Sequence, residues 1–274
     1  MKINWILETN IFKEGIDLLI REIKGQSMTY GTMKYIPFSD LGKQLTIEGE
    51  SSLDHALYYG SINLARKLMG RNISIFNTFK FYECLNYYPV FGKYLVNRDY
   101  VMYPYGDFVR AFNTVIDFFK TDRLFVSPND GEKTFTGTII PKSVVYEDSV
   151  RIWEDIDRFH QIPHNTLVIA SSYKIIDGEW RFVVCDDKVI TGSKYKEEGK
   201  SIRITETENS PVFKYAQSIL DTIEFKADPL WTLDICECNG EYKVMEIGGF
   251  SCAGLYACDL RLICESVKSV MEKM

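Results

Sequence analysis

The feature that most constrains the fold is a hairpin signal near the end of the chain, in the stretch WTLDICECNGEYKVMEIGGF from Trp231 to Phe250. Asn239-Gly240 joins two runs of alternating apolar and polar residues, which predicts two antiparallel strands and a tight turn. Each predicted strand carries an acidic residue, Asp234 in the first and Glu246 in the second. Charged side chains are seldom buried without a partner, so these carboxylates either face solvent or bind a partner.

The composition is that of an ordinary globular chain. It has 274 residues, 46% of them hydrophobic, and a formal net charge of -6, which suits two closely packed domains or one elaborate domain. The mild acidity disfavours nucleic-acid binding, which uses a basic surface. No apolar stretch reaches the roughly 18 residues of a membrane span, and the N-terminus lacks a signal-peptide core. We therefore expect a cytoplasmic protein without a membrane partner; the sequence leaves the oligomeric state open.

The character of the predicted elements changes near residue 120. Before it, strands alternate with helices, as in the strand Ala56–Gly60, its turn and the helix from Ile62, which is typical of an α/β sheet. After it, strand pairs dominate. We predict a mixed α/β fold with two domains, residues 1–120 and 121–274. The other predicted helices are 11–23, 108–120, 150–161, 210–223 and 253–273, and the main predicted strands are 3–7, 28–37, 123–126, 136–140, 166–173, 180–185 and 188–193.

Two carboxylates on adjacent strands that face the same way would form an oxygen-lined site for Mg²⁺. A hairpin whose acids only face solvent explains Asp234 and Glu246 as well, and for the hairpin alone it is the better explanation. Lys133 follows a Gly-containing loop and could reach nucleotide phosphates, although the spacing of a Walker A loop is absent; taken alone, it is better explained as a surface lysine. Glu179 and Arg181 alternate onto one strand face, where they could bind a ribose hydroxyl and a phosphate or form an ion pair of little energetic value.

The cysteines and histidines suggest no covalent catalysis. Seven cysteines without framework spacing fit free thiols. Cys236 and Cys238 would share one strand face, but no nearby partner supports a metal role. The three histidines are too scattered to suggest a catalytic triad: His55, His160 and His164.

Taken in order along the chain, these groups resemble those of an ATP-grasp protein. The lysine precedes an apolar strand, E-x-R follows on the next strand, and the two acids lie on a late hairpin. The segments PNDGEKTFTG, EWRFVV and YYGS are similar to a clade of ATP-grasp proteins with additional arginines and lysines. That clade is widespread in bacteriophage and bacterial genomes and is predicted to ligate amino acids or peptides. The resemblance spans about Ala56 to Tyr256.

The resemblance implies an ATP-grasp fold behind a Rossmann-like pre-ATP-grasp domain, with ATP and Mg²⁺ as cofactors. By position, Lys133 would bind ATP phosphates, Glu179 would lie on the ribose or phosphate side, and Arg181 would bind a phosphate or acyl-phosphate. Lys194 or Lys196 would reach the γ-phosphate or the acceptor. Asp234 and Glu246 would be the Mg²⁺ ligands. The strand beside adenine would contain Val168, Ile169, Ala170 and Ser171.

The activity implied is ligation of a carboxylate to an amine or a related nucleophile through an acyl-phosphate. The partners would be small-molecule substrates or a peptide or protein acceptor, in the host cytoplasm if a phage encodes the chain. Two positions depart from the pattern: Gly248 stands where an Asn ligand is usual, and Ser127 where Arg or Lys is common before Pro128. A catalytically degenerate nucleotide-binding or regulatory module is therefore the alternative. A third is an enzyme of nucleotide-kinase or glycosyl type that uses Tyr58–Ser61 as a phosphate turn.

Overall fold

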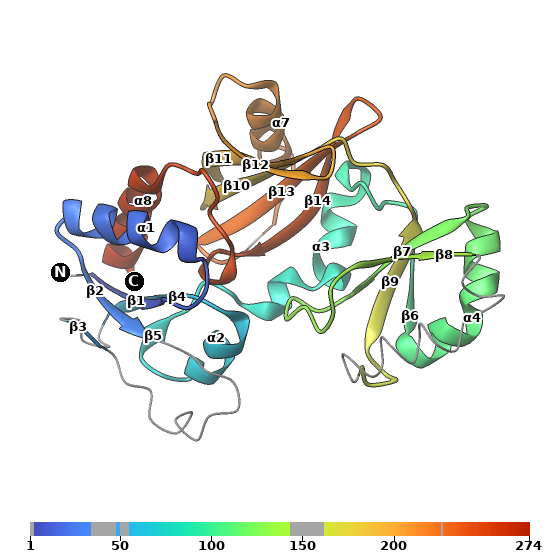
Figure 1. Ribbon diagram of the computed structural model, residues 1–274, viewed down its shortest axis with the longest axis horizontal. Coiled ribbons are helices and arrows are strands. Elements are labelled where there is room, and N and C mark those ends of the chain that lie inside the picture. Colours follow the sequence, from blue (N-terminus) through green and yellow to red (C-terminus); the bar gives the residue numbers. More distant parts are fainter. Residues whose placement is uncertain (1–2, 34–47, 50–54, 143–161, 226) are drawn as a thin grey trace. The chain divides into compact units, whose positions relative to one another are not determined.

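The computed structural model describes residues 3–33, 48–49, 55–142, 162–225 and 227–274. These residues form two compact units (Figure 1). The first combines Met1–Thr78 with Asp177–Met274, and the second is Phe79–Ile176. The chain therefore leaves the first unit at Thr78 and returns to it at Asp177. These units do not coincide with the predicted division at residue 120, which stays a prediction.

The first sheet of the first unit is mostly parallel, with the strand order β3-β2-β1-β4-β5. The central strand β1 pairs in parallel with both β2 and β4. All five residues of β1 are buried, as expected for a parallel strand covered on both faces. Its strands are β1 (Asn4–Glu8), β2 (Thr29–Met33), β3 (Glu48–Gly49), β4 (Ala56–Tyr59) and β5 (Ile73–Ser74).

Helices cover both faces of this sheet. On one face, Trp5 and Leu57 pack in one hydrophobic core with residues of α1 (Lys13–Gly25) and α8 (Leu260–Lys273), two helices that lie side by side in Figure 1. On the other face, a second core includes residues of α2 (Ile62–Leu68). The predicted strand, turn and helix from Ala56 are confirmed, and the side chain of Ser61 caps α2 by accepting from the Leu64 N–H.

The second sheet of the first unit is antiparallel, with the order β12-β11-β10-β13-β14. The predicted hairpin is confirmed: β13 and β14 pair across Asn239-Gly240, and both turn residues have positive φ, as a two-residue hairpin turn favours. Helix α7 (Pro211–Leu220) covers one face, where Phe213 contacts Phe182. The strands are β10 (Gly178–Cys185), β11 (Lys188–Glu197), β12 (Lys200–Glu206), β13 (Leu230–Cys238) and β14 (Glu241–Gly249).

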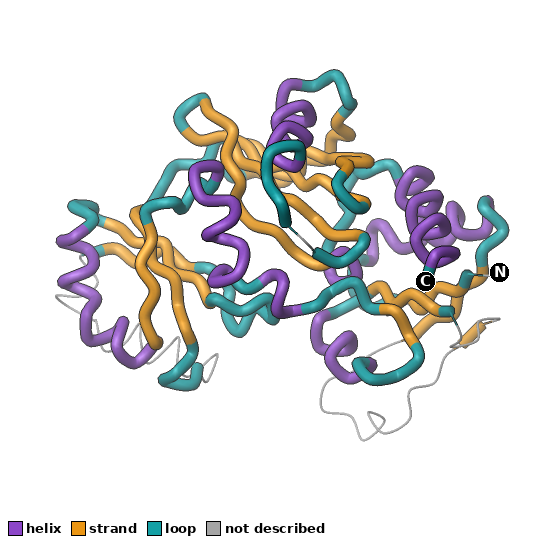
Figure 2. The backbone as a smooth tube through the Cα atoms, turned by 180° about the vertical axis from the view of Figure 1, so that it is seen from behind, coloured by secondary structure: helices purple, strands orange, loops and turns teal. Residues whose placement is uncertain are grey.

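The second unit is built on a four-stranded sheet with the order β6-β9-β7-β8, all of its pairs antiparallel. Helix α4 (Tyr105–Phe118) shares a hydrophobic core with this sheet. Figure 2 shows the helices in purple and the strands in orange. The strands are β6 (Tyr100–Pro104), β7 (Arg123–Pro128), β8 (Thr138–Pro141) and β9 (Leu167–Ser172). The other helical segments among the described residues of this unit are α3 (Cys84–Phe91), η2 (Phe79–Tyr82) and η3 (Gly92–Tyr94).

Several elements differ from the prediction. The last helix begins at Leu260 rather than Ala253, because Asp259 caps it by accepting from the N–H groups of Arg261 and Leu262. Helix α3 and strands β6 and β12 were not predicted. The strands predicted at 166–173 and 180–185 belong to different sheets. The helix predicted at 150–161 lies outside the described residues, as does part of the extended segment 28–37.

Within the residues that the structure describes, no helix is both long and apolar enough to span a membrane.

Candidate functional site

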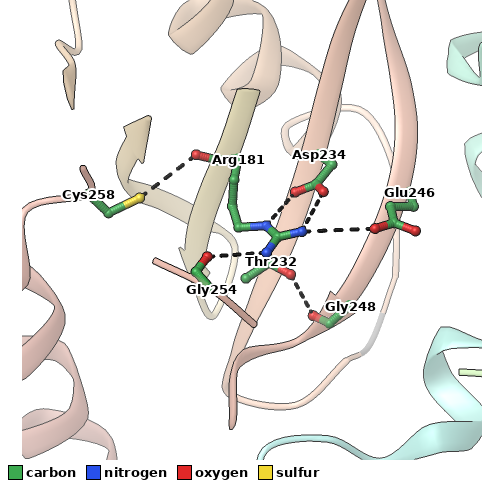
Figure 3. Close-up of polar contacts among 7 residues, drawn as sticks. All are labelled: Arg181, Thr232, Asp234, Glu246, Gly248, Gly254 and Cys258. Carbon is green, nitrogen blue, oxygen red and sulfur yellow. Dashed lines mark hydrogen bonds and ion pairs between the residues drawn. The ribbon is translucent and has the colours of Figure 1, made fainter. Parts of the chain in front are cut away.

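Three charged side chains predicted to act in the site lie on neighbouring strands of the antiparallel sheet (Figure 3). Arg181 on β10 is opposite Asp234 on β13, and Asp234 is opposite Glu246 on β14. We call the sheet face that carries them the acid face; α7 covers the other face. The structure therefore brings these three predicted residues together.

A β-bulge places Glu246 on this face. Asp234 pairs with Glu246, but the next residue of β13, Ile235, pairs with Val244, so that Met245 is the extra residue of β14. Strict alternation would put Val244 and Glu246 on the same face. Because a bulge shifts the alternation by one residue, Val244 is buried opposite Ile235 while Glu246 lies opposite Asp234.

Arg181 and Asp234 form a buried, bidentate ion pair. The guanidinium Nε donates to Oδ1 of Asp234 at 2.8 Å, and Nη2 donates to Oδ2 at 2.6 Å. Nη1 donates to the Gly254 carbonyl at 3.1 Å. Burial alone would lower the pKa of the Arg181 guanidinium, but the charge and hydrogen bonds of Asp234 outweigh it and raise the pKa. Arg181 is therefore a permanent positive charge between two acids.

Glu246 is the more accessible acid. Its side chain is 39% exposed, against 2% for Asp234, and its Oε1 lies 3.9 Å from Nη2 of Arg181. Mg²⁺ takes one or two protein carboxylates and completes its shell with water and phosphate oxygens. Both carboxylates lie on the acid face, and each Asp234 oxygen that accepts from Arg181 retains a further lone pair for such an ion. The described residues contain no cluster of three or more His, Cys, Asp or Glu side chains that could hold a metal by themselves.

Gly248 supplies no side-chain ligand to the acid face. Its carbonyl oxygen accepts a hydrogen bond from Thr232 Oγ1 at 3.1 Å across the hairpin. A Cβ atom built at Gly248 would lie 3.2 Å from that hydroxyl and close to no other group. With Gly248 in place of Asn, the acid face therefore lacks one side-chain oxygen ligand. A side chain at this position would have to displace only the Thr232 hydroxyl.

The remaining predicted residues of this sheet divide between its two faces. Glu179 forms an ion pair with Lys196, Nζ to Oε1 at 2.9 Å, and alternation puts Glu179 on the same face as Arg181. Lys194 is opposite Trp180 in the ladder, and its Nζ lies 4.8 Å from the centre of the Trp180 ring. Lys194 therefore lies on the face away from Arg181, whereas Lys196, the other lysine considered from the sequence, lies on the acid face.

Two tyrosines that the sequence did not single out flank Arg181. The rings of Tyr195 and Tyr256 stack, with centroids 4.6 Å apart and planes 9° apart. The Arg181 guanidinium carbon lies 5.8 Å from the centre of the first ring and 5.3 Å from that of the second. Burial, and then the charge of Asp234, raise the pKa of the Tyr195 hydroxyl, so Tyr195 stays protonated. Tyr256 lies where a helix was predicted, and nothing in the sequence pattern marked it.

The other predicted nucleotide contacts belong to the second unit. Lys133 lies in the turn between β7 and β8 with a φ of 53°, and its side chain is exposed. Asp130 fixes this turn, because its carboxylate accepts from the N–H of Thr134 at 3.0 Å and from Thr134 Oγ1 at 2.5 Å. Lys133 thus belongs to an ordered turn and lies five residues before strand β8, which begins at Thr138.

The predicted adenine-side strand is β9, between β6 and β7. Val168 and Ala170 pack in the core beneath α4, and alternation turns Ile169 and Ser171 to the opposite face. The Ser171 hydroxyl is buried and has no hydrogen-bond partner among the described residues. Buried hydroxyls nearly always find a partner, so this oxygen has capacity for a further contact.

The two minor hypotheses gain little from the structure. In the turn Tyr58–Ser61, the Ser61 N–H donates to Oε2 of Glu8 at 2.7 Å, and the Gly60 N–H donates to the Ser251 carbonyl at 2.8 Å. These amides already bind acceptors of the chain itself, and Glu8 would repel a phosphate. Cys236 and Cys238 are both buried.

The chain matches the model of a known family over more than half of its length. A model of the ATP-grasp domain, R2K clade family 2, matches residues 110–265, which is more than half of the chain. The matched range includes Lys133, β9 and the whole acid face. No curated protein sequence matches the chain.

Solved structures with similar folds cover almost the whole chain. D-cycloserine synthetase DcsG has a TM-score of 0.58 at 11% identity, over 98% of this chain and 99% of that one. D-alanine–D-alanine ligase from Bacillus anthracis has a TM-score of 0.55 at 14% identity, over 100% and 99%. The ATP-grasp ligase PsnB, complexed with a minimal precursor, Mg and ADP, has a TM-score of 0.51 at 11% identity, over 98% of both chains. At these identities the likeness concerns the fold alone.

Proposed function

The chain belongs to the R2K clade of the ATP-grasp family, and from this premise we propose that it is an ATP- and Mg²⁺-dependent ligase that joins a carboxylate to an amine or a related nucleophile. The observation that carries the proposal is the acid face. It presents a fixed guanidinium, bound by Asp234 and 3.9 Å from Glu246. A site of this kind binds and neutralises phosphate groups in the transition state rather than supplying a nucleophile.

The reaction proposed has two steps. A carboxylate oxygen of the first substrate attacks the γ-phosphorus of ATP, and the bond from that phosphorus to the β,γ-bridging oxygen breaks, which gives an acyl-phosphate and ADP. The amine of the second substrate then attacks the acyl carbon, phosphate leaves with the bonding electron pair, and the amine loses a proton. Mg²⁺, when bound, would offset the negative charge of the phosphates.

The residues of the chain would bind and orient the reacting groups. Arg181 would contact the transferred phosphoryl group or the acyl-phosphate through the two of its five N–H groups that Asp234 and Gly254 do not bind. Glu246 and Asp234 would hold Mg²⁺. No covalent protein intermediate is required, and burial raises the pKa of the Cys258 thiol, the one beside Arg181, to about 12, so that its nucleophilic thiolate form is scarce.

For the substrates we propose amino acids or peptides. Among the similar structures are a D-alanine–D-alanine ligase and a ligase complexed with a precursor peptide, and this similarity of fold is the support for that class. For the nucleotide we retain the predicted contacts of Lys133 with phosphates and of Val168–Ser171 with adenine. On the sheet that carries Arg181, we transfer the acceptor-side role from Lys194 to Lys196, because Lys196 shares the acid face with Arg181.

The test is release of ADP and phosphate from Mg-ATP in the presence of a panel of amino acids and short peptides. Glu246→Gln keeps the size of the side chain but removes its charge, and we expect turnover to fall at least about a hundredfold, as when a group that stabilises transition-state charge is lost. Glu241→Gln is the matched control, because Glu241 lies on the same strand, exposed and paired with Lys243. Equal turnover in the two variants would contradict the proposal.

A second candidate function, the degenerate nucleotide-binding module, is favoured by one observation. Gly248 offers no oxygen donor from a side chain, so the acid face has one ligand fewer than the pattern it resembles. In that case Mg-ATP would raise the melting temperature of the protein, while no substrate of the panel would elicit release of ADP.

A further inference from the structure

The segment Ala253–Asp259, which we call the strap, lies across the acid face between β14 and α8. Hydrogen bonds from three strands fasten it along its length, so its position is well defined. Tyr59 Oη of β4 donates to the Ala253 carbonyl at 2.8 Å, the Ala257 N–H donates to Ser193 Oγ at 3.1 Å, Thr205 Oγ1 donates to the Ala257 carbonyl at 2.6 Å, and the Asp259 N–H donates to Thr191 Oγ1 at 2.8 Å.

Tyr256 in the middle of the strap has an unfavourable backbone conformation. Its φ is 49°, in the left-handed region that bulky side chains seldom adopt because it is sterically strained. Its ring nevertheless stacks nearly parallel on Tyr195, which is itself the extra residue of a β-bulge between β10 and β11. Strained residues and β-bulges are frequent at functional sites. Here the strained Tyr256 and the bulge residue Tyr195 both lie beside Arg181.

The strap and Tyr195 of β11 together restrain the Arg181 guanidinium. Both tyrosine rings lie within 6 Å of the guanidinium carbon, the range of an effective cation–π contact. The Gly254 carbonyl, two residues before Tyr256, accepts from Nη1. Asp234 binds Nε and Nη2 from the sheet, so Asp234 and Gly254 together bind all three guanidinium nitrogens (Figure 3).

We propose that Tyr256 is a positioning residue, which together with Tyr195 keeps the Arg181 guanidinium in a single orientation before a substrate binds. An arginine held in this way does not lose side-chain freedom when a phosphate or carboxylate arrives, and that loss otherwise weakens binding or slows the reaction. The strained backbone of Tyr256 is retained for this contact. The consequence for catalysis rests on the proposed function; the restraint on Arg181 does not.

The decisive variants separate the ring from the backbone strain. Tyr256→Asn removes the ring and puts in its place a residue that tolerates positive φ, so the melting temperature should stay at or above that of the wild type. Tyr256→Phe keeps the ring. Lys120→Asn is the matched control for relief of strain, because exposed Lys120 in the second unit has a φ of 50°.

The first measurement needs no activity. In ¹⁵N-resolved NMR of the whole chain, with the Arg181 Nε–Hε signal assigned from its loss in Arg181→Lys, we expect a ring-current-shifted, slowly exchanging proton in the wild type, Tyr256→Phe and Lys120→Asn. In Tyr256→Asn this signal should lose its shift and exchange faster. An unchanged signal in Tyr256→Asn would overturn the inference whether or not the wild type turns over ATP.

The second measurement is turnover of Mg-ATP with the best substrate of the panel. We expect kcat to fall roughly tenfold in Tyr256→Asn, which corresponds to a cation–π contact of about 1.4 kcal/mol, while Tyr256→Phe stays within about twofold of the wild type. Turnover in Tyr256→Asn equal to that of Tyr256→Phe would overturn the catalytic part. A wild type that releases no ADP would contradict the proposed function alone, and the NMR result would still decide the role of Tyr256.

Discussion

The guanidinium of Arg181 binds both carboxylate oxygens of Asp234, at 2.8 Å and 2.6 Å, and the two side chains are only 11% and 2% exposed. Asp234 therefore binds Arg181 through both carboxylate oxygens before any ligand is present. A buried ion pair adds little net stability, but it is costly to break, because removal of one partner leaves the other charge buried and alone. This asymmetry makes the pair testable by measurements of stability.

We predict strong coupling between these two residues. Arg181→Met alone should lower the free energy of unfolding by about 3–5 kcal/mol, since it strands the charge of Asp234. The double variant Arg181→Met, Asp234→Leu should be markedly more stable than the sum of the single effects implies. Urea unfolding of the four proteins in the cycle, at one pH, measures the coupling.

The same cycle on Arg261 and Glu265 is the control, because that pair is exposed at successive turns of α8, 2.8 Å apart. Its coupling energy should be below about 1 kcal/mol. Equal coupling in the two cycles would mean that the charges of Arg181 and Asp234 are solvated in solution.

A second prediction concerns the point where the chain leaves the first unit. Asp228, just before β13, accepts from the Thr78 N–H at 2.8 Å and from Thr78 Oγ1 at 2.6 Å. Asp228→Ala removes a buried acceptor from both donors and should lower the free energy of unfolding by about 1–3 kcal/mol. Asp187→Ala, at an exposed turn position, should cost less than about 0.5 kcal/mol. Similar denaturation midpoints for the two variants would show that the hydrogen bonds from Thr78 to Asp228 do not stabilise the fold.

The sequence was sufficient for the parts of the fold whose signals are local. Asn239-Gly240 marked the hairpin, and Ser210-Pro211 marked the start of α7, because turn and cap chemistry depends on a few adjacent residues. Helix α3 was missed since Pro89 lies inside it, which usually argues against a helix. The separation of β9 from β10 into different sheets depends on long-range pairing, which no local pattern encodes.

The acid face was only partly predictable for a similar reason. The types and order of Arg181, Asp234 and Glu246 along the chain suggested a shared site. Their common face, however, depends on the bulge at Met245, and alternation alone gives no sign of a bulge. The bulge at Tyr195 likewise brings Lys196, rather than Lys194, to the side of Arg181. Tyr256 was missed because its role depends on a tertiary contact of the strap.

The third prediction is a loss of stability at alkaline pH that depends on Cys264. Burial raises the pKa of this thiol from 9.0 to about 12, and the charges of Glu22 and Glu265 add to the shift. The unfolded chain loses the proton near pH 9 while the folded chain retains it. The stabilisation is therefore complete below pH 9 and is lost progressively as the pH rises from 9 to 12, by up to roughly 1.4 kcal/mol per pH unit.

Urea unfolding at about pH 8, 9.5 and 10.5, a range that spans the ordinary thiol pKa, compares the wild type with Cys264→Ala. The variant should start less stable because of the smaller side chain, but its stability should decline less steeply with pH. Other groups that titrate in this range affect both proteins alike. Parallel declines would show that the thiol ionises equally in the folded and unfolded states.

The last prediction restores the oxygen donor that Gly248 lacks. Gly248→Asn should be tolerated, within about 1 kcal/mol of the wild type, because its Cβ meets only the Thr232 hydroxyl, at 3.2 Å. If Asp234 and Glu246 hold a divalent ion, the added amide oxygen should increase the affinity for Mn²⁺, measured without nucleotide by electron paramagnetic resonance. Gly248→Ala adds the Cβ without the donor and should leave the affinity unchanged.

The neighbouring glycine shows why only position 248 can be used in this way. A Cβ at Gly249 would lie 2.5 Å from the backbone Cα of Asn77 and 2.1 Å from its side-chain oxygen, so Gly249→Ala should destabilise the hairpin instead. A gain of Mn²⁺ affinity in Gly248→Asn that disappears when Glu246→Gln is added would place the ion on the acid face. The same gain with Glu246→Gln present would place the ion elsewhere and contradict the assignment of Glu246 as a ligand.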